Sequence, residues 1–578
     1  MLVFSRLFLV AAIAGLATIS TSAAEKTASQ LLPPSVVAYA EIPQPSRLID
    51  GVLDHPLSKE IEEHPDYQKY LQSPQYQQAQ EVVRIVEAKL GVDVRKAATT
   101  LSAEGIYLGG DLASQGVVLL VHSADEQLAM RARDTFLELA RAEATRQGRP
   151  DPIQIERAHD IDVYQLDKVL FALHGRWLIV ANKSLLMSAV LNNCADEEAA
   201  CLANDSQFTE VYQARPATAA AWTYLDFRLL RAAGLLKSAA NGKSDNPALE
   251  LLIGGIIGAL PNAPYVTGTL HFEPKRIGLA FSMPANVPAA AKQREFYFGA
   301  AGQGAAPPLL KPQQALLSLS TYRDFGSLWR HAPDLFNDQV NAGFAEAEAG
   351  LSTFFSGRNF RDDILGNLEP GLQLVVARQE FADVIPALKL PAGAIVVRLK
   401  NAQETARIFK VTFQSAIGFL NVVGGMNGVD PLDVNAEKQG ELVVVSAEYL
   451  PPKDPAVRAA AAPQFNVSPT AVFLGDKFIL ASSKALALEV VELVRKEATA
   501  EQHVNTALNA DLTTLHTVLI DNQEPLVAQS MLEKGHDRAA AEKEIKGLIE
   551  ALRHIKATSL RLLVEEALLS LSWDVELN

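Results

Sequence analysis

The sequence predicts an α+β fold made of two tandem, internally duplicated halves, each a mainly antiparallel sheet packed with helices. One reason is that the stretch Val169–Leu191 returns later as Ala471–Val491, with Gly175 matching Gly475 in the same register. The other is that neighbouring apolar runs are separated only by short turns. They lack the strand–helix–strand alternation of a doubly wound nucleotide-binding fold.

Each copy of the repeated stretch predicts a hairpin followed by a helix. An apolar run reaches a turn at Gly175 or Gly475, and a second apolar run follows directly. Glycine tolerates the positive φ that tight hairpin turns require. Polar residues that can cap a helix come next, Asn182–Ser184 in the first copy and Ser482-Ser483 in the second, before leucines and valines recur at helical spacing.

The rest of the first half follows the same alternation of apolar runs and amphipathic segments. Its expected elements are the strand Val36–Ile42, the hairpin Gly105–Leu112 with Gly116–His122, the helix Asp125–Ala144, the strand Ala219–Phe227 and the closing hairpin Tyr265–Met283.

Similar elements recur in the second half in the same order. The strand Gly393–Lys400 and the helix Ala402–Phe419 correspond to Gly116–His122 and its helix, with Gly116 aligned to Gly393. Thr513–Ile520, rich in Thr and Leu, is expected to form a strand that corresponds to Ala219–Phe227.

The composition also predicts the domain boundaries. Residues 284–312 are crowded with Ala, Gly and Pro, which is typical of a linker. We therefore expect a signal peptide over residues 1–24, a first repeat over 25–284, an Ala/Gly/Pro-rich linker over 285–309 and a second repeat over 310–578.

The N-terminal residues predict export. Arg6 precedes an apolar core from Leu7 to about Ala17, and the small residues Ser22 and Ala24 follow, which is the pattern of a secretory signal peptide cleaved after Ala24. The apolar core is shorter than the ~20 residues that span a bilayer. We expect a periplasmic or extracellular protein with no transmembrane segment after cleavage.

The charge balance excludes one class of partner. The 578 residues carry a formal net charge of −15. A surface this acidic repels phosphate backbones, so nucleic acid is not expected as a partner.

Two cysteines, Cys194 and Cys201, are the candidate disulfide. They are the only cysteines in the chain and lie in an acidic stretch. In an oxidising compartment a pair this close can form a small disulfide loop. Two free thiols at the end of a helix are the alternative.

The sequence designates no catalytic, cofactor-binding or metal-ligating residue. It contains no GxSxG, Walker A or HExxH motif. His159, Asp160 and Asp162 offer nitrogen and oxygen ligands, but no second ligand pair accompanies them, and the start of an alternating strand explains them equally well. No metal or cofactor is predicted.

Two glycine-bearing apolar stretches, Leu249–Leu260 and Ala416–Val429, are hydrophobic on nearly all sides. Both are too short to span a bilayer. We expect buried core helices; the alternatives are the wall of an apolar ligand cavity or a surface that faces a partner.

The layout resembles that of large exported bacterial proteins of an uncharacterised domain-of-unknown-function type. The residues that carry the resemblance are Leu32-Pro33-Pro34 before the first strand, together with the hairpin glycines Gly175 and Gly475. The resemblance implies a signal peptide and a duplicated α+β unit, and it implies no activity.

Three classes of function follow from these observations. The first is a non-enzymatic exported binding or interaction protein, with an unknown protein as its partner. The second is a carrier of apolar ligands or lipids, suggested by the glycine-bearing helices. The third is a hydrolase whose residues are assembled only in the fold.

Overall fold

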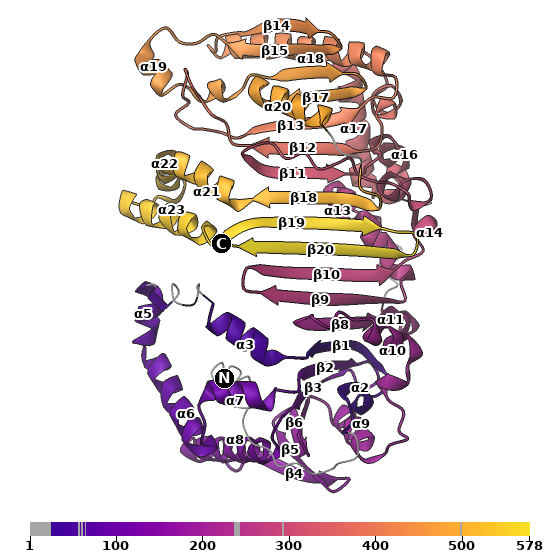
Figure 1. The fold of residues 1–578 in the computed structure, drawn as a ribbon, viewed down its shortest axis with the longest axis vertical. Helices are drawn as coiled ribbons and strands as arrows, with labels where there is room; N and C mark the ends of the chain where they lie inside the picture. The colour runs from indigo at the N-terminus through magenta and orange to yellow at the C-terminus, as the bar shows by residue number, and fades with distance from the viewer. Residues whose placement is uncertain are drawn as a thin grey trace. The chain divides into compact units, whose positions relative to one another are not determined.

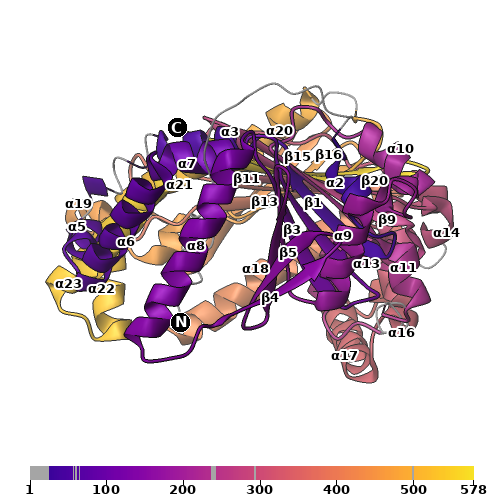
Figure 2. The same cartoon turned by 90° about the horizontal axis from the view of Figure 1, so that it is seen from below.

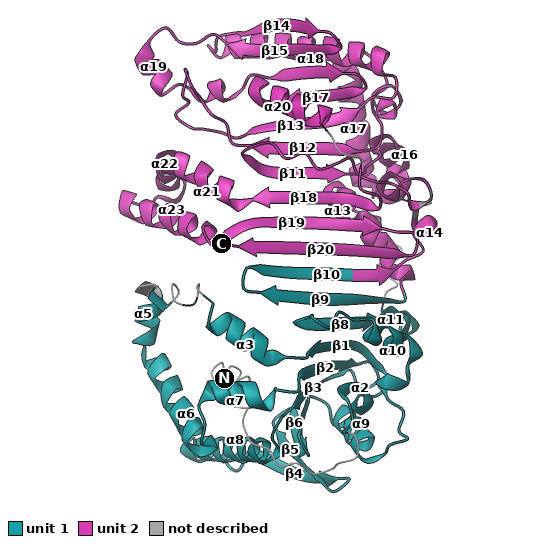
Figure 3. Cartoon of the chain, viewed as in Figure 1, with its two compact units in different colours: residues 1–235, 264–281 teal, residues 236–263, 282–578 magenta. Residues whose placement is uncertain are grey.

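The computed structural model describes residues 25–578, except 56–57, 59–61, 64, 236–242, 292–293 and 497–499. The predicted signal peptide therefore lies outside the described residues. The chain divides into two compact units, unit 1 with Met1–Leu235 and Pro264–Phe281 and unit 2 with Leu236–Ala263 and Ser282–Asn578 (Figure 3).

Unit 1 contains the first ten strands, the last of which, β10, continues into unit 2. They are β1 (Val36–Ile42), β2 (Ile106–Asp111), β3 (Gly116–His122), β4 (Ile153–Ala158), β5 (Ile161–Leu166), β6 (Val169–His174), β7 (Trp177–Ala181), β8 (Ala221–Asp226), β9 (Tyr265–Glu273) and β10 (Arg276–Pro284). From β4 to β9 the strand order is β4-β5-β6-β7-β3-β2-β1-β8-β9, and every neighbouring pair is antiparallel (Figure 1).

Unit 2 repeats this topology. Its strands are β11 (Ala315–Thr321), β12 (Leu372–Ala377), β13 (Ala392–Arg398), β14 (Leu432–Gln439), β15 (Leu442–Tyr449), β16 (Thr470–Leu474), β17 (Lys477–Ala481), β18 (Val504–Asp511), β19 (Ile555–Val564) and β20 (Leu568–Leu577). Their order is β14-β15-β16-β17-β13-β12-β11-β18-β19-β20, again antiparallel throughout. The α+β class is thus confirmed, and each strand of unit 1 from β1 to β9 has a counterpart numbered ten higher. This match is what a duplication requires; the duplication itself stays a prediction.

The helices of unit 1 lie between and against these strands. They are α2 (Ala28–Leu31), α3 (Pro45–Leu53), α5 (Pro65–Leu71), α6 (Pro74–Leu90), α7 (Val94–Leu101), α8 (Glu126–Arg146), α9 (Ser184–Ala195), α10 (Ser206–Gln213) and α11 (Phe227–Ala232).

The helices of unit 2 begin with one that precedes β9 in sequence. They are α13 (Pro247–Ala259), α14 (Val287–Ala291), α15 (Glu295–Phe298), α16 (Phe325–Leu335), α17 (Asp338–Phe354), α18 (Ala402–Met426), α19 (Pro455–Ala459), α20 (Lys484–Arg495), α21 (Leu512–Asp521), α22 (Gln523–Lys534) and α23 (Arg538–Leu552).

Helices pack on parts of both faces of each sheet, to which alternate side chains of a strand point. In unit 1, Val118, Ile179 and Ala181 pack against α9, while α8 contacts β4 and β6 on the other face (Figure 2). In unit 2, α20 packs on Val396, Ile479 and their neighbours, and α18 contributes to the core on the opposite face. Helices α9 and α20, and likewise α8 and α18, are therefore counterparts.

The repeated hairpins form as predicted. Two-residue turns, Gly175-Arg176 and Gly475-Asp476, join β6 to β7 and β16 to β17. The glycines have φ of 56° and 58°, and the residues after them are not in the positive-φ region. Glycine at the first turn position with this geometry is typical of a type II′ turn, whose twist suits a hairpin.

The predicted caps are only partly correct. The Ser483 hydroxyl caps α20, but Lys183 precedes α9 and no side chain caps that helix. Asn182 and Ser482 instead each accept a hydrogen bond from a backbone N–H of the neighbouring strand in the sheet. The donors are Val117 at 2.8 Å and Gly393 at 2.9 Å respectively. Their role is to fix the strand β3 or β13 beside the hairpin.

The expectation of a strand at Thr513–Ile520 is wrong, because these residues lie in helix α21. The counterpart of β8 is β18, and each of the two strands ends in an aspartate that caps the next helix. Asp511 accepts the N–H of Thr514, as Asp226 accepts those of Arg228 and Leu229. The cap starts a helix despite the β-branched residues that follow.

The units differ from the predicted domain boundaries in two places. Leu236–Ala263 belongs to unit 2, although it precedes the last strands of unit 1 in sequence. The segment expected as a linker contains α14 and α15, and Phe296, Tyr297 and Phe298 of α15 are fully buried. The Ala, Gly and Pro content of that segment predicts a linker, but the segment contributes buried aromatic residues to unit 2.

Candidate functional site: an apolar pocket in unit 1

A pocket lies in unit 1 between α7 and α8 on one side and β3, β6 and β7 on the other. The alternation of each strand places one set of apolar side chains under α8, and the small residues Ala129 and Ala132 of α8 leave space above them. The lining residues are Leu101, Leu119, Val121, Ser123, Ala129, Ala132, Arg133, Phe136, Phe171, Leu178 and Val180.

The pocket is almost entirely apolar and small. Its volume is about 70 Å³, below the ~150 Å³ of an engineered apolar cavity that binds benzene. Leu119 and Leu178 are half-buried rather than buried, so the pocket reaches the surface. An aliphatic group of a few carbons, or one end of a longer chain, fits this space.

Arg133 is the one charged residue among the lining residues. Its Nε and Nη2 lie 2.8 Å from the carboxylate of its neighbour Asp134, and its side chain is 23% exposed. The guanidinium carbon lies 5.8 Å from the centroid of the Tyr164 ring. The pocket thus combines apolar walls with one cation.

At three of the equivalent positions unit 2 has larger apolar side chains or an aromatic ring in place of the arginine. Strand pairing sets Leu178 opposite Val121 in unit 1 and Phe478 opposite Val397 in unit 2. Counted from the helix cap, Asp125 or Asn401, the residues Ala132 and Arg133 correspond to Ile408 and Phe409. The rings of Phe409 and Phe478 lie 4.9 Å apart. At two other lining positions unit 1 has the larger residue, Phe136 against Thr412 and Phe171 against Ala471.

Outside the pocket, unit 1 contains a buried polar cluster around Glu41, whose carboxylate is bonded to neighbouring side chains. The Glu41 carboxylate, in a side chain 1% exposed, accepts from Arg215 Nε at 2.6 Å, from the Tyr39 hydroxyl at 2.8 Å and from the Tyr212 hydroxyl at 3.1 Å. The Arg215 guanidinium also lies 3.6 Å from the centroid of the Tyr212 ring. Burial, and then the charge of Glu41, raise the pKa of Tyr39 and of Tyr212, so both hydroxyls stay protonated donors.

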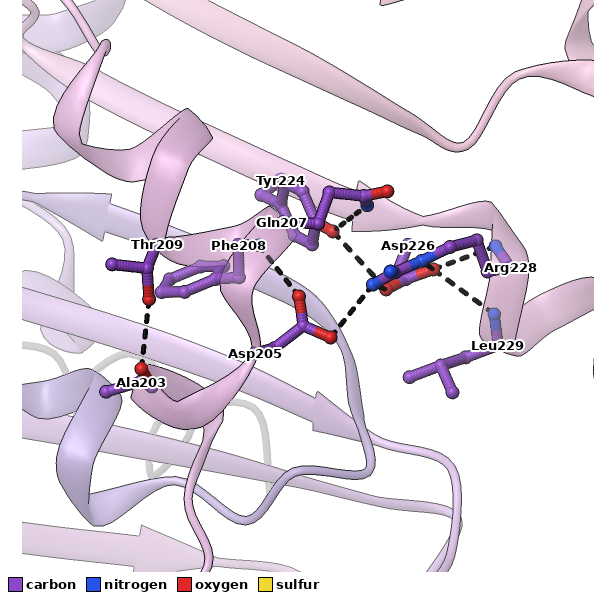
Figure 4. Close-up of polar contacts among 9 residues, drawn as sticks. All are labelled: Ala203, Asp205, Gln207, Phe208, Thr209, Tyr224, Asp226, Arg228 and Leu229. Atoms are coloured by element: carbon purple, nitrogen blue, oxygen red, sulfur yellow. Dashed lines mark hydrogen bonds and ion pairs between the residues drawn. The ribbon is translucent and has the colours of Figure 1, made fainter.

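A second polar cluster joins two helix caps (Figure 4). Arg228 Nη2 lies 2.7 Å from Asp226 and 2.9 Å from Asp205, and these two aspartates cap α11 and α10. Burial raises the pKa of Asp226, but the bonds from Arg228 and the backbone outweigh it, so that its pKa lies below the ordinary value. Since the Asp226 and Asp205 carboxylates are each bound to Arg228 and to backbone N–H groups, the cluster holds α10 and α11 together.

The predicted disulfide is absent from the structure, in which Cys194 and Cys201 are both free thiols. Cys194 packs against the apolar core of unit 1, whereas Cys201 Sγ lies 3.1 Å from Asn204 Oδ1 in the cap of a short turn. The two sulfur atoms therefore have different surroundings, one apolar and one polar. Burial raises the pKa of the Cys194 thiol to about 12, with only a partial opposing effect from Lys26.

We expect both thiols of the native protein to react slowly with an aromatic disulfide reagent at pH 8. For Cys194 the reason is its raised pKa, because a thiolate is the reactive form, and for Cys201 it is burial, since the residue is 7% exposed. Both should react once the chain is unfolded in guanidinium without reductant. The raised pKa of Cys194 also implies stability that is present below about pH 8.5 and lost as the pH rises toward 12. If the unfolded chain had no titratable thiol, Cys194 and Cys201 would be joined in a disulfide, and the free thiols of the structure would be contradicted.

Of the three residues considered for metal binding, His159 and Asp160 lie in a turn and Asp162 lies in β5. His159 and Asp160 both have positive φ, 49° and 61°, and connect β4 to β5. Over the described ranges, no three His, Cys, Asp or Glu side chains gather in a way that could hold a metal ion.

The two apolar helices are not the buried core helices that we expected. Helix α13 buries Glu250, Gly254, Gly255 and Ala259 and exposes Leu249, Leu252 and Ile253. Its buried face is made of small residues because α15 packs closely there: a side-chain carbon at Gly255 would overlap the ring of Tyr297.

The buried residues of helix α18 all lie between its start and Ile417; they are Thr405, Ile408, Phe409, Phe413 and Ile417. Beyond them the apolar residues are exposed: Phe419 by 66%, Val422 by 64% and Met426 by 83%. Within the part of the chain that the structure describes, α18 is also the one helix long and apolar enough to cross a membrane by length and composition. The sequence alternative of a surface that faces a partner fits this end of α18 better than a core helix does.

Comparisons with known proteins give no family. No family model matches the chain, and no curated protein matches it. Solved structures of TP0453 in crystal forms I and III have a TM-score of 0.23, identities of 12% and 11%, and cover 45% of this chain and 80% of that chain. Crystal form IV has the same TM-score and 12% identity, and covers 47% of this chain and 85% of that chain. Similarity at this level supports no statement on the fold or function of this protein.

The sequence did not single out any residue of the pocket. The signal was nevertheless present in the repeat, since residue-by-residue alignment of the halves sets Leu178 against Phe478. The correspondence of residues in α8 with residues in α18 is hidden in the sequence, because the sequence alignment sets Gly116 against Gly393. Strand pairing in the structure instead sets Gly116 against Ala392. That shift of one residue conceals the pairs Ala132 with Ile408 and Arg133 with Phe409.

Proposed function

We propose that the protein is an exported, non-enzymatic binding protein that holds an apolar ligand in the pocket beneath α8. The observation that carries this proposal is the contrast between the two units. At three corresponding positions unit 2 has Ile408, Phe409 and Phe478, which pack in a core cluster, whereas unit 1 has Ala132, Arg133 and Leu178, which line the open pocket. Export is supported by the signal-peptide pattern of residues 1–24.

An open apolar space has an energetic cost that a ligand would offset. Unfilled volume in a core forfeits dispersion contacts and burial of apolar area. Each methylene that a ligand buries there is worth about 0.8 kcal/mol. Because the topology of unit 2 accommodates larger side chains at the same positions, the fold itself does not demand the opening in unit 1.

The buried acids of unit 1 favour binding over hydrolysis. Glu41 and Asp226 are each bound to an arginine, Asp111 accepts from Ser35 and Ser114, and Asp125 caps α8. None of these four lines the pocket. The exposed end of α18 would suit the interaction function, but it lies in unit 2 and is not part of this pocket.

Filling the pocket tests the proposal. Purified protein should carry an apolar molecule that solvent extraction and native mass spectrometry detect, and Leu178→Phe should reduce the bound fraction about tenfold or more, because it introduces the ring that unit 2 has at this place. The matched control is Leu185→Phe, at an exposed position of α9. Equal occupancy in the wild type and in Leu178→Phe would show that the pocket is not the binding site.

A further inference from the structure

Arg133 is costly in an apolar wall, and the fold does not require it. Its counterpart at the same distance from the helix cap in unit 2 is Phe409, which packs in the core. The Arg133 partner Asp134 is 55% exposed, so this ion pair contributes little to stability.

The guanidinium of Arg133 also retains donors. Arginine has five N–H groups in a planar fork that matches a carboxylate. Asp134 is bound by Nε and Nη2 through one of its oxygens. Among the described residues, Nη1 has no protein acceptor.

From these observations, and resting on the proposed function, we propose that the ligand is an amphiphile with an acidic head group, of which an aliphatic carboxylate is the simplest case. The head group binds the Arg133 guanidinium, and the aliphatic chain enters between Ala132 and Leu178. The small volume of the pocket fits a short chain or the end of a longer one.

Octanoate and 1-octanol, which share a chain and differ in the head group, are the probes for this inference. We expect calorimetric titration of the wild-type protein to show octanoate bound roughly tenfold more tightly than 1-octanol, because hydrogen bonds to a charged group are the stronger ones. Arg133→Met should remove this preference and leave 1-octanol binding unchanged, and Arg133→Lys should keep part of it.

The matched control is Arg141→Met, which removes the same charge from α8 at an exposed residue that pairs with Asp151 and does not line the pocket. It should keep the preference for octanoate. Circular dichroism of each variant checks that the fold is intact.

The outcomes separate the two proposals. Equal affinity for both probes in the wild type, or a preference that survives Arg133→Met, overturns the acidic head group and leaves the apolar pocket standing. Failure of both probes to bind the wild type overturns the proposed function as well.

Discussion

Arg215→Ala is expected to lower the free energy of unfolding of unit 1 by about 3–5 kcal/mol, which is the usual cost of leaving one partner of a buried ion pair without the other. Glu41 loses its only arginine partner at 2.6 Å and keeps two tyrosine hydroxyls. Those two bonds do not neutralise a carboxylate in a side chain that is 1% exposed. The stacking of the guanidinium on Tyr212 is lost in addition.

Urea unfolding followed by tryptophan fluorescence measures this loss, since Trp222 lies 5.8 Å from the ring of Tyr212. The control is Arg157→Ala, whose side chain is 68% exposed and pairs with Asp160 at 3.7 Å; its cost should stay under about 1 kcal/mol. Equal effects of the two variants would mean that Glu41 is stabilised without Arg215.

The hairpins, the class of fold and several helices could be predicted because their signals are local. Gly175 and Gly475 predict turns through backbone geometry alone, and the spacing of apolar residues in α8 and α20 predicts a buried helix face. The prediction of a strand at Thr513–Ile520 is wrong because the signal that decides its structure is not local. Its β-branched residues favour a strand, and the cap at Asp511 that starts the helix depends on where β18 ends.

The pocket and the unit boundary could not be predicted, since each depends on residues distant in sequence. A pocket exists only where Ala132 of α8 faces Leu178 of β7, and neither residue is unusual by itself. Helix α13 belongs to unit 2 because Arg294 and Arg323 bind it there, and neither arginine lies near it in the chain. The exposed end of α18 is likewise indistinguishable in sequence from a core helix, because which of its residues are covered depends on elements distant in the chain.

The attachment of α13 gives the second large prediction. Arg323 is 3% exposed and donates to the carbonyl of Leu251 at 2.7 Å, to that of Leu252 at 3.3 Å and to Asn505 Oδ1 at 2.8 Å. Its guanidinium carbon lies 3.7 Å from the centroid of the Tyr297 ring, a cation–π contact away from water. One side chain thus connects α13, α15 and β18 within unit 2.

Arg323→Met is therefore expected to destabilise unit 2 by about 3 kcal/mol, since the buried Asn505 Oδ1 and two partly buried helix carbonyls lose a charged donor at about 1–3 kcal/mol each. The effect should be local to α13. Hydrogen exchange followed by mass spectrometry should show faster exchange over Pro247–Ala259 than in the wild type, because the remaining polar attachments of this helix are Glu250 to Arg294 at 2.8 Å and the Tyr297 hydroxyl to the carbonyl of Leu252 at 2.9 Å.

Two comparisons identify the cause of such a change. Arg330→Met removes a positive charge from an exposed position of α16 and should leave α13 unaffected. Arg323→Lys retains a charge but cannot reproduce the planar fork that reaches two helix carbonyls and Asn505 together, so it should restore only part of the protection. Full protection in Arg323→Lys would mean that α13 is held by charge alone, and unchanged exchange in Arg323→Met would mean that Glu250 and the packing of Tyr297 against Gly255 suffice to hold the helix.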